Sequence, residues 1–106
     1  MKLSSSGGNS NQEHLVVSSS YTFVLGEKVK IDMVSDLHVE GEKCEGVFYL
    51  SDRRICLENS FLDNPAKLTR VRKHEVMHAF LGISGLSDII GDIKLEEAIC
   101  VLSEVI

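Results

Sequence analysis

The sequence predicts one α+β domain in which an antiparallel sheet of three or four strands is followed by two helices. Between residues 21 and 57, short apolar runs are separated by polar residues, and residues 29–33 alternate apolar and polar with period two, as in a strand with one buried face. After residue 64, apolar residues recur at steps of three and four, as on one face of a helix. A length of 106 residues corresponds to a single domain.

Composition narrows the class of protein. Hydrophobic residues make up 43% and charged residues 25%, which is typical of a globular chain. The net charge of -5 argues against a nucleic-acid partner, and the apolar runs are too short to cross a membrane. Three scattered cysteines do not form a disulfide framework, so we expect reduced thiols in a cytoplasmic protein. No residue pattern indicates an oligomeric state.

The chain is predicted to begin with a flexible arm. Residues 1–20 are rich in Ser, Gly, Asn and Gln and bury too little apolar surface to offset the entropy of ordering. This arm is either native or a remnant of cloning. The folded domain is expected to comprise residues 21–106.

Strands are predicted at residues 21–25, which end at Gly26, and at residues 29–33. Two further apolar runs, 47–50 and 55–57, flank the polar residues 51–54. That pattern is typical of a β-hairpin.

Two helices are predicted in the second half of the chain. Asn64 is a suitable N-cap and Pro65 is tolerated in a first turn, so the first helix begins there and is broken at Gly82 and Gly85. The second follows Gly91 and Asp92. Its expected inward face is apolar and comprises Leu95, Ala98, Ile99, Leu102, Val105 and Ile106.

One motif indicates chemistry: His74-Glu75-Val76-Met77-His78, an H-E-x-x-H within the first helix. Histidines four residues apart project from one face, so both imidazoles can bind one zinc ion. Zinc lowers the pKa of a bound water to roughly 7 and generates a nucleophile. Glu75, next to the first histidine, is the expected general base that accepts the proton of that water.

A hydrolytic zinc needs a third protein ligand, and Glu96 and Glu97 at the start of the second helix are the candidates. Glu96 borders the apolar face of that helix, whereas Glu97 shares the opposite side with Glu104, like a solvated stripe. We therefore expect Glu96 to be the ligand, with Glu97 as the alternative. Cys100 is a weaker candidate, because a small buried cysteine is the commoner role on a helix.

The motif and the acidic pair resemble the gluzincin class of zinc metallopeptidases. The wider runs 72–81 and 95–99 are similar to compact metallopeptidase domains of phages and mobile elements. The resemblance implies a zincin-like fold, one zinc per chain and peptide hydrolysis. It also implies a substrate that adds as a strand to a sheet edge, at residues 47–50 or 55–57. In that class the ligand glutamate is commonly followed four residues later by an Asp or Asn that orients a histidine, whereas this chain has Cys100 or Val101 there.

Other residues and other functions are left open by the sequence. Tyr49, His38 and Tyr21 are candidates for stabilising the oxyanion of the tetrahedral intermediate. The main alternative to a peptidase is a non-catalytic module that binds a protein and uses zinc for stability. Such a structural site prefers four protein ligands, for which Cys100 is a candidate, and does not need Glu75. A metal-free interaction domain is the third possibility.

Overall fold

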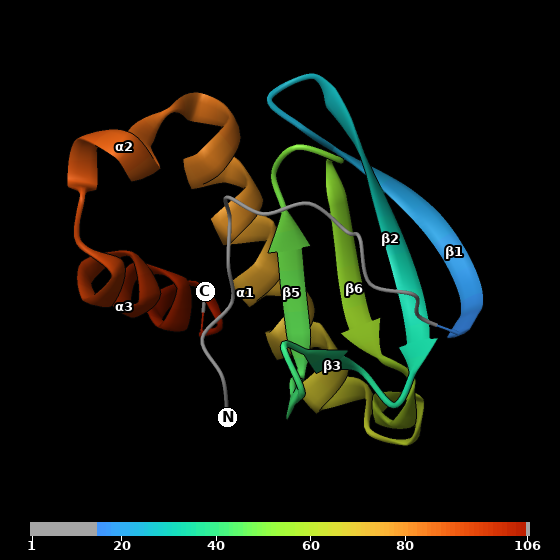
Figure 1. Ribbon diagram of the computed structural model, residues 1–106. Coiled ribbons are helices and arrows are strands. Elements are labelled where there is room, and N and C mark those ends of the chain that lie inside the picture. The colour runs from blue at the N-terminus through green and yellow to red at the C-terminus, as the bar shows by residue number, and fades with distance from the viewer. Residues whose placement is uncertain (1–14, 106) are drawn as a thin grey trace.

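Strands between residues 15 and 58 form a four-stranded mixed sheet, with helices on one of its faces (Figure 1). The computed structural model describes residues 15–105. The strands of the sheet are β1 (Leu15–Val24), β2 (Glu27–Ser35), β6 (Arg54–Glu58) and β5 (Gly46–Tyr49), in that spatial order. Two short strands, β3 (His38–Val39) and β4 (Glu42–Lys43), form a separate hairpin. The predicted α+β class is confirmed.

The first strand is longer than predicted. Residues 15–20, expected to belong to the arm, pair with β2 in a register that joins Leu15 to Ser35. Their side chains are exposed, so backbone hydrogen bonds order this segment where apolar burial does not. Leu25 and Gly26 have φ angles of 52° and 79°, and two consecutive positive values suit the tight turn that joins β1 to β2. Residues 1–14 lie outside the described part of the chain.

The expectation of a purely antiparallel sheet is wrong for the central pair of strands. β1 with β2 and β5 with β6 are antiparallel, as predicted for the hairpins, but β2 and β6 run parallel. Period-two alternation identifies strands without specifying their neighbours. The strand order depends on residues 36–45, which connect β2 to β5. Because this segment passes the position that β6 later occupies, β5 lies on the far side of β6 from β2. Because β6 is central, residues 55–57 are not an edge, whereas β5 is one.

Three helices follow a short 3₁₀ turn, η1 (Asn59–Asp63). Helix α1 (Pro65–Ser84) begins as predicted, with the Asn64 side chain accepting a hydrogen bond from the Lys67 amide. It continues through Gly82 and ends at Gly85, whose φ of 83° is the left-handed conformation of a helix C-cap. The short helix α2 (Leu86–Ile90) was not predicted. Helix α3 (Ile93–Ser103) begins after Asp92, which caps it.

Helix α1 lies between the sheet and α3 (Figure 1). On one face of the sheet, Phe48, Ile55 and Leu57 pack with Val71 and Ala79 of α1. Alternate residues point to the other face, where a second apolar cluster forms. Its members are Val34, Leu37, Val39, Cys44, Val47, Tyr49 and Cys56. No helix among residues 15–105 is long and apolar enough to span a membrane.

The inward face of α3 differs from the predicted one. Leu95 and Leu102, expected to be buried, are 51% and 64% exposed. Cys100 and Ser103 are buried instead, and the Ser103 hydroxyl donates to the backbone oxygen of Lys73 on α1. The acidic side of α3, not its apolar side, therefore lies against α1.

Candidate metal centre

Helix α1 places His74 and His78 on one face, one turn apart, as the motif predicts. Their ring centroids are 5.1 Å apart, and both side chains are buried. The two imidazoles point toward α3, which supplies three glutamates to them. We call His74, His78, Glu96, Glu97 and Glu104 the histidine–glutamate cluster.

Glu97 joins the two histidines through the nitrogens that zinc ligands commonly use. One carboxylate oxygen lies 2.6 Å from Nε2 of His74, and the other lies 3.1 Å from Nε2 of His78. Three side chains thus converge, with two nitrogens and a carboxylate as donors. This is the donor set of a His₂Glu zinc site.

Glu96 and Glu104 bind the opposite nitrogens of the same rings. An oxygen of Glu96 lies 2.7 Å from Nδ1 of His78, and an oxygen of Glu104 lies 2.7 Å from Nδ1 of His74. Each imidazole is therefore held by a carboxylate on both of its nitrogens. The geometry separates Glu97, on the Nε2 side, from Glu96 and Glu104, on the Nδ1 side.

In this geometry the alternative candidate, Glu97, and not Glu96, contacts Nε2 of both histidines. The prediction placed Glu97 and Glu104 on a solvated stripe, but α3 is rotated so that this stripe faces the histidines. Glu104 was not among the predicted site residues. Its signal was its position seven residues after Glu97, on the same side of the helix.

Glu75, the expected general base, is 2% exposed and packs under the edge strand β5. A Cβ atom added at Gly46 would lie 2.9 Å from Cγ of Glu75, closer than real Cβ contacts allow. Only glycine thus lets β5 approach the Glu75 side chain so closely. Gly46 belongs to the site through this contact, although sequence reasoning had not identified it.

Replacing Gly46 by alanine is expected to destabilise the domain by about 1–3 kcal/mol and to displace Glu75, because the new methyl group also meets Leu57 and Val71. Urea unfolding of the metal-free protein measures the first effect. Gly41→Ala is the control, since Gly41 has a positive φ but open space around it. It should lose stability without displacing Glu75. Wild-type stability in Gly46→Ala would contradict the close approach.

The cluster carries an excess of negative charge. Burial lowers the pKa of His74, but the hydrogen bond that its ring donates to Glu104 and the charges of Glu75 and Glu97 outweigh burial, so the pKa is raised above its usual value. Four carboxylates surround two imidazoles here, counting Glu75. Buried charges need pairing or a bound ion, and a divalent cation suits this balance.

Cys100 lies next to the histidines and is fully buried. Its Sγ and one ring nitrogen from each of His74 and His78 all lie within 4.8 Å of one another. Burial, together with the charges of Glu97 and Glu96, raises the pKa of this thiol far above its usual range. The metal-free thiol is therefore protonated at neutral pH, although its position allows it to approach a metal.

The three candidates for oxyanion stabilisation lie elsewhere. Tyr49 points to the sheet face opposite α1, where burial raises its pKa to about 12 and its buried hydroxyl has no hydrogen-bond partner within residues 15–105. His38 contacts Asp36, and Tyr21 stacks under the Lys28 ammonium at the other edge of the sheet. The structure does not bring Tyr49 to the histidine–glutamate cluster, because strand periodicity directs it away from α1.

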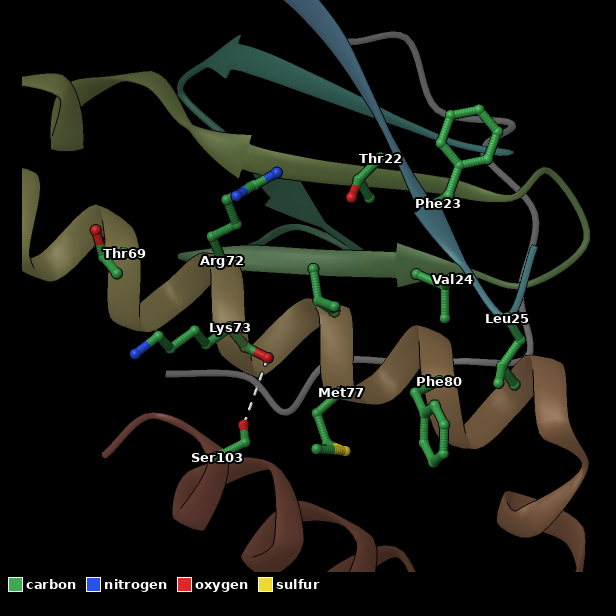
Figure 2. A pocket seen from close by; sticks show the side chains of 11 residues that line it. Thr22, Phe23, Val24, Leu25, Thr69, Arg72, Lys73, Met77, Phe80 and Ser103 are labelled. Atoms are coloured by element: carbon green, nitrogen blue, oxygen red, sulfur yellow. Dashed lines mark hydrogen bonds between the residues drawn. The ribbon is translucent and has the colours of Figure 1, made fainter. Parts of the chain in front are cut away.

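A cleft of about 620 Å³ opens between β1 and α1 (Figure 2). It is mostly apolar, and its lining comprises Thr22, Phe23, Val24, Leu25, Thr69, Arg72, Lys73, Val76, Met77, Phe80 and Ser103. No member of the histidine–glutamate cluster lines it. This cleft is therefore distinct from the candidate metal centre.

No protein-family model, curated protein or solved structure matches this chain. The geometry of the histidine–glutamate cluster is therefore the basis for assigning a function.

Proposed function

We propose that this protein is a zinc-dependent peptidase with a zincin-like fold, which binds one zinc ion through His74, His78 and Glu97. The observation that carries the proposal is the position of the Glu97 carboxylate, 2.6 Å and 3.1 Å from Nε2 of the two histidines. The gluzincin-like sequence of the motif supports the same reading. Free, buried cysteines support a reducing compartment, and we propose a cytoplasmic location.

In this proposal the chain's own residues hold the reactants and move the proton. Zinc, when bound, supplies a Lewis acid for the scissile carbonyl and a water with a pKa near 7. Glu75 would accept a proton from the attacking water and deliver it to the leaving amine. Its near-complete burial keeps competing solvent away from the carboxylate.

The proposed substrate is a protein or peptide bound in extended form along β5. This strand ends the sheet order and packs directly on Glu75 through Gly46. Strand addition uses backbone hydrogen bonds for affinity and alternate side chains for selectivity. A peptide paired with β5 would therefore run past the general base.

The second candidate function is a zinc-stabilised module that binds a protein without cleaving it. The observation that favours it is the buried Cys100 thiol close to both histidines. If Cys100 joined His74, His78 and Glu97, zinc would have four protein ligands and no open position for water.

Both candidates require zinc, so metal content is the first test. We expect one zinc per chain in wild type and almost none in His78→Ala. His38→Ala is the matched control, because His38 lies in β3, contacts Asp36 and is outside the histidine–glutamate cluster. At zinc about 100-fold above its Kd, a chelator should remove about 2.7 kcal/mol of stability. The melting temperature then falls by roughly 10–20 °C. Failure of the wild type to take up zinc would remove both candidates.

A further inference from the structure

The two carboxylates on the Nδ1 side of the histidines have a role that neither proposed function assigns. We propose that Glu96 and Glu104 are positioning residues, each of which holds one metal-binding histidine with its Nε2 directed at the metal. This inference rests on the proposed zinc site. It gives this chain two positioning carboxylates beside the ligand Glu97, one within α3 and one at the C-cap of that helix.

The distances separate the roles of the three glutamates. Glu96 and Glu104 each lie 2.7 Å from an Nδ1 atom, of His78 and His74 respectively. Both are charge-assisted hydrogen bonds of normal length. A ring that donates from Nδ1 to a carboxylate has its Nε2 lone pair available for a metal, and its orientation is fixed.

Helix geometry explains how one element serves both histidines. Glu97 and Glu104 are seven residues apart, which is close to two turns, and Glu96 is offset by one residue from Glu97. His74 and His78 are one turn apart on the facing helix. The three carboxylates therefore bracket the two rings, and Glu97 lies between them on the Nε2 side.

Burial makes these contacts effective. The side chains of Glu96 and Glu104 are 13% and 25% exposed, and those of the two histidines are below 10%. Ion pairs with so little solvent around them are screened less than surface pairs. No Asp or Asn stands four residues after Glu97, and Val101 in that place is exposed. The orienting group is thus at residue 104 for His74 and at residue 96 for His78.

The test measures zinc affinity by competition with a zinc-buffering chelator, in wild type and in Glu96→Ala, Glu104→Ala, Glu96→Gln and Glu104→Gln. Glu42→Gln, an exposed carboxylate on β4, is the control. We expect each alanine variant to bind zinc about 10–100-fold more weakly. The glutamine variants should be intermediate, because an amide oxygen still accepts from Nδ1 but carries no charge.

A second measurement separates positioning from folding. The melting temperature of each zinc-free variant reports any loss of helix packing. If Glu96 and Glu104 only supported the fold, their substitution would lower this melting temperature and leave the zinc affinity of the folded protein unchanged. If an alanine variant does not fold, its glutamine counterpart decides. Zinc affinities within about twofold of wild type in the folded variants would overturn the inference. That result would leave the proposed function intact, whereas absence of zinc from wild type would refute both.

Discussion

Glu75→Gln is expected to keep one zinc per chain and to lose peptide hydrolysis by about 10²–10⁴-fold. Glutamine matches the shape of glutamate in the buried space beneath Gly46 but cannot accept a proton from water. The measurement uses peptides that the wild-type protein cleaves in a random library. Cleavage of these peptides by the variant is then followed by mass spectrometry. Zinc content is determined on the same samples.

Two results would contradict this role. Hydrolysis close to the wild-type rate would show that another group is the base. Loss of zinc would show that Glu75 is a ligand or is needed to form the site. Glu42→Gln controls for removal of one carboxylate and should behave as wild type. A wild type that binds zinc but cleaves no library peptide favours the non-catalytic module.

Glu97→Ala is expected to lose zinc more completely than Glu96→Ala. Glu97 supplies the donor oxygens on the Nε2 side of both histidines, whereas Glu96 contacts only Nδ1 of His78. Removing a ligand should therefore cost more affinity than the about 10–100-fold expected for a residue that orients one. Zinc titration against a competing chelator gives both values.

The ratio of the two affinities decides between the two glutamates. Weaker binding in Glu96→Ala than in Glu97→Ala would restore Glu96 as the third ligand. Because the residues are neighbours on one helix and both pair with His78, the two variants control for each other. Both remove one negative charge from the same face of α3.

Features that depend on neighbouring residues in the chain were predictable from the sequence. The cap at Asn64, the helix across the motif and the hairpin of β5 and β6 all lie where local patterns indicate. The shared face of His74 and His78 follows from their four-residue spacing alone.

Features that depend on long-range pairing were not predictable in the same way. Parallel pairing of β2 with β6 depends on the course of the intervening segment, and the exposed residues 15–20 are ordered by pairing with β2. Neither is encoded in a local period. Each requires knowledge of which strands become neighbours.

In the orientation of α3, burial of the apolar side competes with ion pairing of the acidic side. Apolar periodicity directs Leu95 and Leu102 inward, but both are exposed, and the side that carries Glu97 and Glu104 faces α1 instead. Two histidines on α1 pair with carboxylates from that side, so ion pairing accompanies the rotation. Hydrophobic periodicity alone therefore does not identify the glutamate that contacts Nε2 of both histidines.

X-ray absorption spectroscopy at the zinc edge of the zinc-loaded protein is the most direct test of the proposed catalytic zinc site. For a catalytic site we expect two histidine nitrogens and oxygen neighbours at about 2.0–2.2 Å from zinc, without sulfur. That result means a site with an open position for water. A sulfur neighbour at about 2.3 Å would show that Cys100 is a ligand, which would close the site and contradict a catalytic zinc.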